Sequence, residues 1–220
     1  MVSTRESREG QAATAGEQAA SSGLIVVIGP PGAGKSTVGQ LLAQRLDVAF
    51  VDTDVIIERT EGRTIPEIFV DSGEEAFRAV ERQAVTDALT GAVAELSPGQ
   101  PAVISLGGGA ILADQTQAAL GQGHTVIFLD VALRDAARRA GFDQGRPLLA
   151  LNPRGQWLAL MQHRRPIYES LATHIVDTGG RTAQEVVDAI VVTLNEAAVE
   201  GDASGERSGS ASENSGEDRS

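Results

Sequence analysis

The residues with the clearest chemistry lie near the start of the chain, where residues 29–36 have the sequence GPPGAGKS. This segment matches the pattern G-x-x-x-x-G-K-[ST]. It stands between an apolar run, Leu24–Ile28, and a helix-forming stretch, Lys35–Leu46. A strand, a glycine-rich turn and a helix in this order place backbone N–H groups and a helix N-terminus around the phosphates of a nucleotide. We expect Lys35 to reach the β- and γ-phosphates and the Ser36 hydroxyl to bind Mg²⁺.

Two carboxylates, Asp52 and Asp54, end the second apolar run. One could hold Mg²⁺ through water, and the other could accept the proton of an attacking hydroxyl or a hydrogen bond from it. The alternative is that an aspartate here only caps the following helix. The spacing D-x-D does not separate the two interpretations.

Three glycines, Gly107–Gly109, follow the apolar run Ala102–Ser105. Glycine lets a backbone approach a ligand closely, although a tight strand-to-helix turn would need the same residues. The segment Gly73–Arg78 opens a long helix-forming stretch, and its acidic residues suit a helix N-terminus. Taken alone, Arg78 would be a solvated surface charge.

Two further arginines lie beside residues that interrupt regular structure. Arg146 lies in a glycine-containing segment, residues 141–151, whose composition suits a mobile lid that carries one cation or an ordinary surface loop. Pro166 is expected to break a helix, which would let Arg164 point into a cleft. Arg164 could equally belong to a basic last turn that complements the helix dipole.

Composition limits the possible functions. The net charge of −12 disfavours non-specific nucleic-acid binding and means that an anionic substrate would need local arginine or lysine residues. The absence of cysteine excludes disulfides, zinc–thiolate sites and cysteine nucleophiles, and it fits a cytoplasmic protein. The N-terminus lacks the apolar segment of a secretory signal, and no run of 18 apolar residues predicts a membrane span.

Short apolar runs alternate with helix-forming stretches between residues 23 and 200, which predicts an α/β fold with a parallel sheet covered on both faces. The expected strands are Leu24–Ile28, Ala49–Asp52, Ala102–Ser105, Thr125–Leu129 and His174–Val176. The expected helices are Lys35–Leu46, Val55–Thr60, Ile65–Val70, Glu74–Thr90, Gln115–Leu120, Leu133–Ala140, Gln156–His163 and Ala183–Ala198. Residues 1–22 and 201–220 are poor in apolar residues and are expected to be disordered tails. Each motif above falls at or just past the C-terminal end of a strand, where ligands bind in such sheets.

Together these segments resemble the shikimate kinase family. The matching segments are GPPGAGKST at 29–37, DTD at 52–54, GEEAFR at 73–78, SLGGGA at 105–110, RPLL at 146–149 and RRPIY at 164–168. The first is common to many kinases, but the others in this order are specific to the family. The resemblance spans about residues 24–195. It implies the fold of the nucleoside-monophosphate kinases, with five parallel strands, a substrate-binding region at about 53–82 and a lid at about 141–154.

The resemblance also implies ATP-dependent phosphorylation of the 3-hydroxyl of shikimate, with Mg²⁺ as cofactor. The implied catalytic residues are Lys35, Asp54 and Arg146. The implied ATP-binding residues, with Arg139 and Arg181 near the adenine or ribose, are Gly32, Ala33, Gly34, Lys35, Ser36, Thr37, Arg139, Arg146 and Arg181. Shikimate would contact Asp54, Arg78, Gly108 and Arg164, and Mg²⁺ would be held by Ser36 and Asp52. The expected partners are shikimate and ATP, with no nucleic acid and no membrane, and the protein is expected to act as a monomer.

One position departs from the family pattern, because Ala183 stands where the family often has a proline beside the adenine. Other functions also remain open. The chain could be another small P-loop kinase such as a gluconate kinase, or a P-loop protein that binds nucleotide without catalysis. A GTPase is disfavoured, since the chain has no Asn-Lys-x-Asp segment to recognise guanine.

Overall fold

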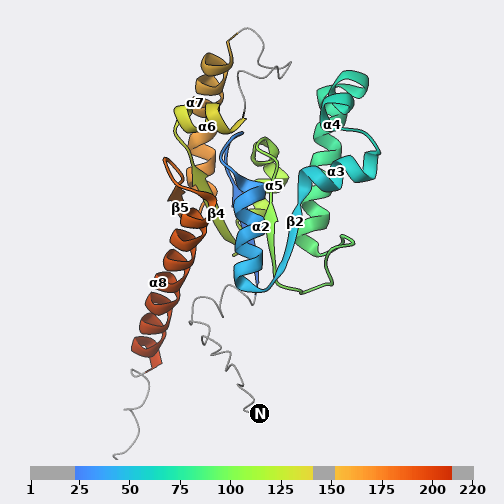
Figure 1. The fold of residues 1–220 in the computed structure, drawn as a ribbon. Coiled ribbons are helices and arrows are strands. Elements are labelled where there is room, and N and C mark those ends of the chain that lie inside the picture. Colours follow the sequence, from blue (N-terminus) through green and yellow to red (C-terminus); the bar gives the residue numbers. More distant parts are fainter. Residues whose placement is uncertain (1–22, 141–151, 210–220) are drawn as a thin grey trace, which may run out of the picture.

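The described residues, 23–140 and 152–209 of a computed structural model, form a five-stranded parallel sheet with helices on both faces (Figure 1). The strand order is β2-β3-β1-β4-β5. The strands are β1 (Leu24–Ile28), β2 (Ala49–Asp52), β3 (Ala102–Ser105), β4 (Thr125–Asp130) and β5 (His174–Asp177). The helices are α2 (Lys35–Leu46), α3 (Thr53–Glu61), α4 (Ile65–Thr90), a 3₁₀ turn η1 (Ala110–Leu112), α5 (Asp114–Leu120), α6 (Leu133–Ala140), α7 (Pro153–Leu171) and α8 (Ala183–Gly209). The predicted fold class is confirmed.

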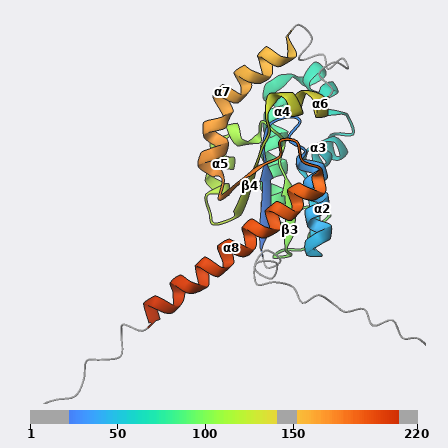
Figure 2. The ribbon, with the colours of Figure 1, turned by 60° about the vertical axis from the view of Figure 1, so that its left-hand side comes forward.

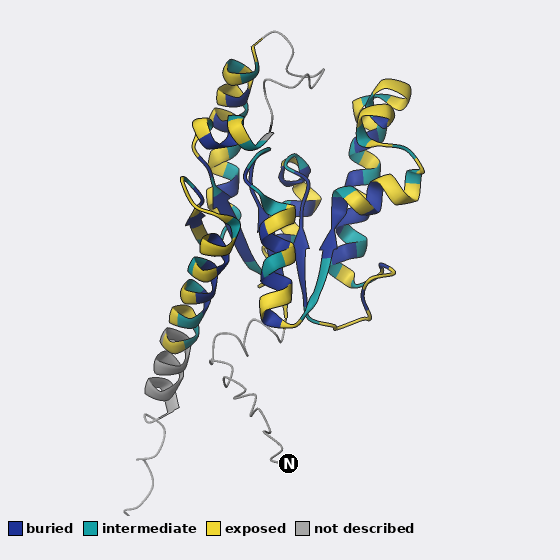
Figure 3. Ribbon diagram, viewed as in Figure 1, coloured by how far each residue is buried: buried dark blue, intermediate teal, exposed yellow. Residues whose placement is uncertain are grey.

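The sheet is the centre of the core. Helices α2 and α8 lie on one face and α5 and α7 on the other (Figure 2). All of β3, and all but the first residue of β1, are therefore buried (Figure 3). Such strands need apolar side chains on both faces, which explains their continuous runs of Val, Ile and Leu. Because the chain has few aromatic residues, aliphatic side chains supply most of this core.

The register of the strands brings the predicted motifs together. Ser105 at the end of β3 lies opposite Asp52 of β2 on one side and Val27 of β1 on the other. The glycine-rich turn after β1, the aspartates after β2 and the glycines after β3 therefore leave the sheet side by side. Parallel strands place their C-terminal ends at one edge, and this edge is where the candidate site lies.

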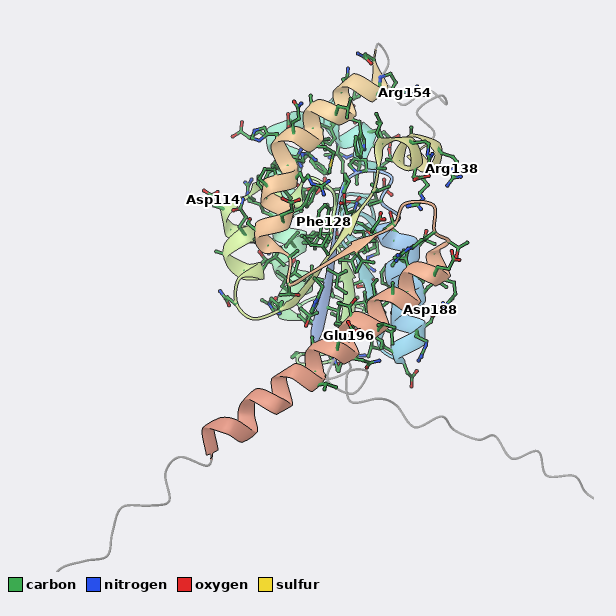
Figure 4. All side chains as sticks on the ribbon, turned by 90° about the vertical axis from the view of Figure 1, so that its left-hand side faces the viewer. Asp114, Phe128, Arg138, Arg154, Asp188 and Glu196 are labelled. Atoms are coloured by element: carbon green, nitrogen blue, oxygen red, sulfur yellow. The ribbon has the colours of Figure 1, made fainter. Side chains whose placement is uncertain are left out.

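The predicted helix break at Pro166 is wrong. Helix α7 continues through Pro166 to Leu171. Pro166 has no N–H and frees the carbonyl of Gln162, but both residues are exposed, so water can satisfy that carbonyl. Beyond the proline, the ring of Tyr168 stacks on Phe128 of β4 with centroids 5.0 Å apart, which holds the last turns of α7 on the sheet. Phe128 is labelled in Figure 4.

Two other boundaries differ from the prediction. The segments expected as two helices, Ile65–Val70 and Glu74–Thr90, are joined in α4, with a kink at Gly73, whose φ of 82° is not helical. Helix α8 extends beyond residue 200 to Gly209 and projects past the sheet (Figure 1). Residues 201–209, which were expected to belong to a disordered tail at 201–220, are therefore helical. The remaining residues of the two expected tails, 1–22 and 210–220, lie outside the described residues. No helix within the described ranges is long and apolar enough to cross a bilayer.

Candidate functional site

The glycine-rich turn between β1 and α2 has the conformation that a phosphate-binding loop requires. Gly32 and Gly34 have φ values of 84° and 91°, a region that glycine adopts without strain. Gly34 is the N-cap of α2, and because glycine has no side chain it makes no capping hydrogen bond. The first N–H groups of α2 are thus not satisfied by a capping side chain, and they are available to bind an anion.

Lys35 begins α2, and its ammonium group lies in a desolvated position. Its Nζ donates to the carbonyl of Pro30 at 3.3 Å. Burial lowers the pKa of Lys35, while the carboxylates of Asp54 and Asp52 oppose this shift and Arg164 adds to it. Both aspartates and Arg164 therefore lie near enough to Lys35 to act on its charge.

A cavity of about 490 Å³ opens above this turn. Nine of the predicted site residues line this cavity: Gly32, Ala33, Gly34, Lys35, Ser36, Thr37, Asp54, Arg139 and Arg181. Ser105, Val38, Ala183 and Val186 complete its lining. The cavity therefore combines backbone N–H groups, cations and one carboxylate, as a nucleotide-binding site beside an acceptor site would.

The two aspartates have different surroundings. Asp52 is the N-cap of α3, and its Oδ1 accepts a hydrogen bond from the Asp54 N–H at 3.0 Å, so Asp52 caps this helix through one carboxylate oxygen. Asp54 faces the cavity instead. Burial, and next the charge of Asp52, raise the pKa of Asp54 to about 6, although Lys35 opposes the shift. A carboxylate with such a pKa can exchange a proton near neutral pH.

The three glycines after β3 let neighbouring side chains approach the backbone closely. A Cβ at Gly107 would lie 2.6 Å from Asp54 Oδ1 and 3.0 Å from Glu81 Oε1. The Gly107 N–H donates to the Thr53 hydroxyl at 3.1 Å, and that hydroxyl donates to the carbonyl of Ser105 at 3.2 Å. This buried link fixes the glycine segment beside Asp54.

The arginines predicted to bind substrate approach the same glycines from two helices. The guanidinium of Arg164 in α7 donates to the carbonyl of Gly108 at 2.8 Å, and the Tyr168 hydroxyl donates to the same oxygen at 2.6 Å. From α4, Arg78 lies so close to Gly109 that its guanidinium would collide with a Cβ there. The two cations therefore flank the segment that follows β3, next to Asp54.

Glu81 was not predicted as a site residue. It is only 4% exposed, and its Oε2 accepts a hydrogen bond from Arg78 Nη1 at 2.6 Å. Glu74, on the exposed side, accepts from Arg78 Nη2 at 3.2 Å. A buried glutamate one turn after an arginine on a helix could have been suspected from sequence, since a buried charge requires a partner.

Arg139 lines the cavity from helix α6. Its guanidinium donates to the carbonyls of Thr178 at 2.6 Å, Arg181 at 3.1 Å and Ala33 at 3.4 Å. It also donates to the Thr178 hydroxyl at 2.9 Å. Arg139 therefore joins the phosphate-binding turn to the segment that leads into α8.

A magnesium ion would find hard oxygen ligands here. Ser36 offers a hydroxyl in the cavity. The carboxylate of Asp52 is not part of the lining, but it lies near enough to act on the charge of Lys35. Among the described residues, no three histidine, aspartate or glutamate side chains gather as a metal cage. This donor set suits Mg²⁺, which in kinases is held by one or two protein oxygens together with phosphates and water. Arg146, predicted to contact the transferred phosphoryl group, lies outside the described residues.

Comparisons with known proteins agree with this geometry. The sequence profile described as shikimate kinase matches residues 31–195. The shikimate kinase of Thermobifida fusca is 51% identical over 171 residues, which cover 78% of this chain and 94% of the relative. The shikimate kinase of Acinetobacter baumannii, solved in complex with shikimate, superposes with a TM-score of 0.71 at 32% identity and covers 80% of this chain and 94% of its own. The enzyme from Aquifex aeolicus gives a TM-score of 0.64 at 30% identity, over 80% of this chain and 98% of its own. The site, the fold and these similarities agree, and the chain belongs to the shikimate kinase family.

Proposed function

We propose that this protein transfers the γ-phosphoryl group of ATP to the 3-hydroxyl of shikimate. The observation that carries the proposal is that two arginines contact the glycine segment that lies against Asp54. Arg164 donates to the Gly108 carbonyl, and Arg78 lies against Gly109. A phosphate-binding turn alone would fit many kinases. The two arginines add a site for an anionic group next to a carboxylate that can receive a hydroxyl.

The shikimate carboxylate would be held by Arg78 and Arg164. An arginine fork can match a carboxylate with two parallel hydrogen bonds, which lysine cannot do. The remaining polar contacts would come from the Gly108 backbone and from Asp54, which would bind the hydroxyls. The arginines provide the local positive charge that a chain of net charge −12 needs in order to bind an anion.

In the transfer step, Asp54 would orient the attacking 3-hydroxyl and accept its proton. A new bond forms between the hydroxyl oxygen and the γ-phosphorus, the bond from that phosphorus to the bridging oxygen breaks, and ADP leaves with the electron pair. Because the pKa of Asp54 is about 6, the carboxylate is ionised at neutral pH in the free protein. Positioning and charge stabilisation dominate in phosphoryl transfer, so we assign to Asp54 mainly the orientation of the hydroxyl.

The phosphates of ATP would be bound by the N–H groups of residues 32–37 and by Lys35, with Arg139 and Arg181 near the adenine or ribose. Ser36 and Asp52 would hold Mg²⁺, which when bound neutralises charge on the β- and γ-phosphates. Arg146 would add a cation at the transferred group. We further propose that the protein acts as a cytoplasmic monomer, without a nucleic-acid or membrane partner.

The product tests the proposal. We expect the purified chain, incubated with ATP, Mg²⁺ and shikimate, to give shikimate 3-phosphate, identified by the coupling of its ³¹P signal to the proton on carbon 3. Asp54→Ala, assayed in parallel, should give almost none. A phosphate on a different hydroxyl, or ADP release without a phosphorylated acid, would overturn the proposal.

A further inference from the structure

Helix α6 carries a buried carboxylate that the proposed chemistry does not use. Asp135 is only 4% exposed, although its neighbours Arg134 and Arg138 point into solvent, as Arg138 does in Figure 4. Burying a charge is costly unless hydrogen bonds or opposite charges compensate it. The contacts of Asp135 therefore show which groups compensate its charge and which segments it holds together.

The carboxylate of Asp135 reaches the segment that leads from β5 into α8. Its Oδ2 accepts a hydrogen bond from the Gly180 N–H at 3.3 Å, while its Oδ1 pairs with Arg138 Nη2 at 3.3 Å. Gly180 has a φ of 67°, so this N–H is presented by a backbone turn in the left-handed region. We call residues Thr178–Arg181 the nucleotide loop, because Arg181 at its end lines the cavity.

Arg139, one turn further along α6, holds the same nucleotide loop through its carbonyls. It donates to the carbonyls of Thr178 and Arg181, as described above. One helix therefore binds the loop with an acceptor at Asp135 and a donor at Arg139. The same helix also touches the phosphate-binding turn, since a Cβ at Gly32 would lie 2.7 Å from the carbonyl oxygen of Ala136.

A residue two positions after the loop explains why such support is needed. Ala183, the first residue of α8, lines the cavity and offers only one methyl group to a base. A small residue contributes little apolar contact, so the position of the loop backbone and of Arg181 must supply more of the binding surface. A loop that is held in place before binding loses less entropy when the ligand arrives.

We propose that Asp135 is a positioning residue, which fixes the nucleotide loop and thereby sets the affinity for the base and ribose of the nucleotide. The inference rests on the proposed binding of ATP in this cavity. The proposal assigns the two parts of the nucleotide to different segments of the protein. The phosphates bind to the turn after β1, and the base and ribose depend on the loop that Asp135 holds.

The test is calorimetric titration of the full chain with ADP and with inorganic pyrophosphate, for the wild type and for Asp135→Ala. We expect the variant to bind ADP roughly 10-fold more weakly, since the nucleotide loop loses the acceptor that holds the Gly180 N–H and Arg138 loses its carboxylate partner. Pyrophosphate affinity should not change, because the phosphate-binding turn is untouched. Asp135→Asn keeps one acceptor oxygen and should recover part of the ADP affinity.

Two controls keep the result interpretable. Glu196→Gln, an exposed change of charge on α8 beyond the cavity, should leave both affinities unchanged. Leu120→Ala, buried in α5 away from the cavity, should lower the melting temperature without a change in ADP affinity, and so it measures the effect of lost stability alone.

Unchanged ADP affinity in Asp135→Ala would overturn the proposal, and so would an equal loss of ADP and pyrophosphate affinity. If Asp135→Ala does not fold, Asp135→Asn decides alone, and an ADP affinity equal to that of the wild type contradicts the role. Failure of the wild type to bind ADP or pyrophosphate would instead refute the proposed nucleotide site itself.

Discussion

Asp54 is predicted to reduce the stability of the ligand-free protein. Its pKa of about 6 lies well above the ordinary 3.8 of an aspartate, mainly because the carboxylate is buried. The native state therefore holds the proton of Asp54 more tightly than the unfolded state does. As pH rises from about 4 to about 6, this difference lowers the free energy of unfolding, and above pH 6 the penalty is constant.

The size of the penalty follows from the two pKa values. Each pKa unit corresponds to about 1.4 kcal/mol, so the ionised carboxylate costs up to about 3 kcal/mol at pH 8 and about half of that at pH 5. Asparagine has nearly the same shape and no charge. We therefore expect Asp54→Asn to be more stable than the wild type, with a melting temperature higher by roughly 5 to 10 °C at pH 8.

The assay is thermal unfolding followed by circular dichroism at pH 8 and pH 5, without ligands. The stabilisation should be about half as large at pH 5, and turnover of the variant should be largely lost. Asp188→Asn, an exposed change on α8, serves as the matched control and should move the melting temperature very little. An Asp54→Asn protein that is no more stable than the wild type at pH 8, or that gains equally at both pH values, would refute the reasoning.

Three further substitutions test other parts of the site. Lys35→Ala should reduce turnover by roughly 10²-fold or more without lowering stability, because it removes a cation from the phosphates but also a buried charge; turnover within a few-fold of wild type would contradict this. Arg78→Ala and Arg164→Ala should each weaken shikimate binding by about 30-fold or more while ADP affinity stays unchanged, as calorimetry can show. Trp157→Phe removes the hydrogen bond from the indole N–H to the Pro31 carbonyl, 3.1 Å long, and should lower the free energy of unfolding by about 1 kcal/mol in urea titrations; no change would show that water replaces the bond.

The sheet and the positions of the motifs could be predicted because they depend on local patterns. The runs of β-branched residues predict the strands almost to the residue, and parallel pairing then places Asp54 and Gly107–Gly109 at one edge. The path of α7 could not be predicted in the same way. Pro166 is a strong local signal for a break, but the packing of Tyr168 against Phe128 and the exposure of the freed carbonyl outweigh it.

Residues that act through other residues were also not predicted. Glu81 and Asp135 are charged, and sequence alone places such residues at the surface. For Glu81, the spacing from Arg78 on one helix was a signal that the sequence contains, whereas the burial of Asp135 becomes visible only when the fold brings Gly180 to it. The phosphate-binding residues are predictable because their spacing is fixed by the ligand. The supporting contacts depend on how distant segments meet, so they require the structure.

The central claim is that the two arginines beside Asp54 make this protein a kinase of shikimate rather than of another polyhydroxy acid. The most direct measurement is the rate of ADP release with shikimate and with gluconate, in the presence of ATP and Mg²⁺. We expect kcat/KM to be at least about 10³-fold higher for shikimate, because buried polar groups built for one substrate strongly reject another. A higher kcat/KM for gluconate, or ADP release that neither acid stimulates, would contradict the account.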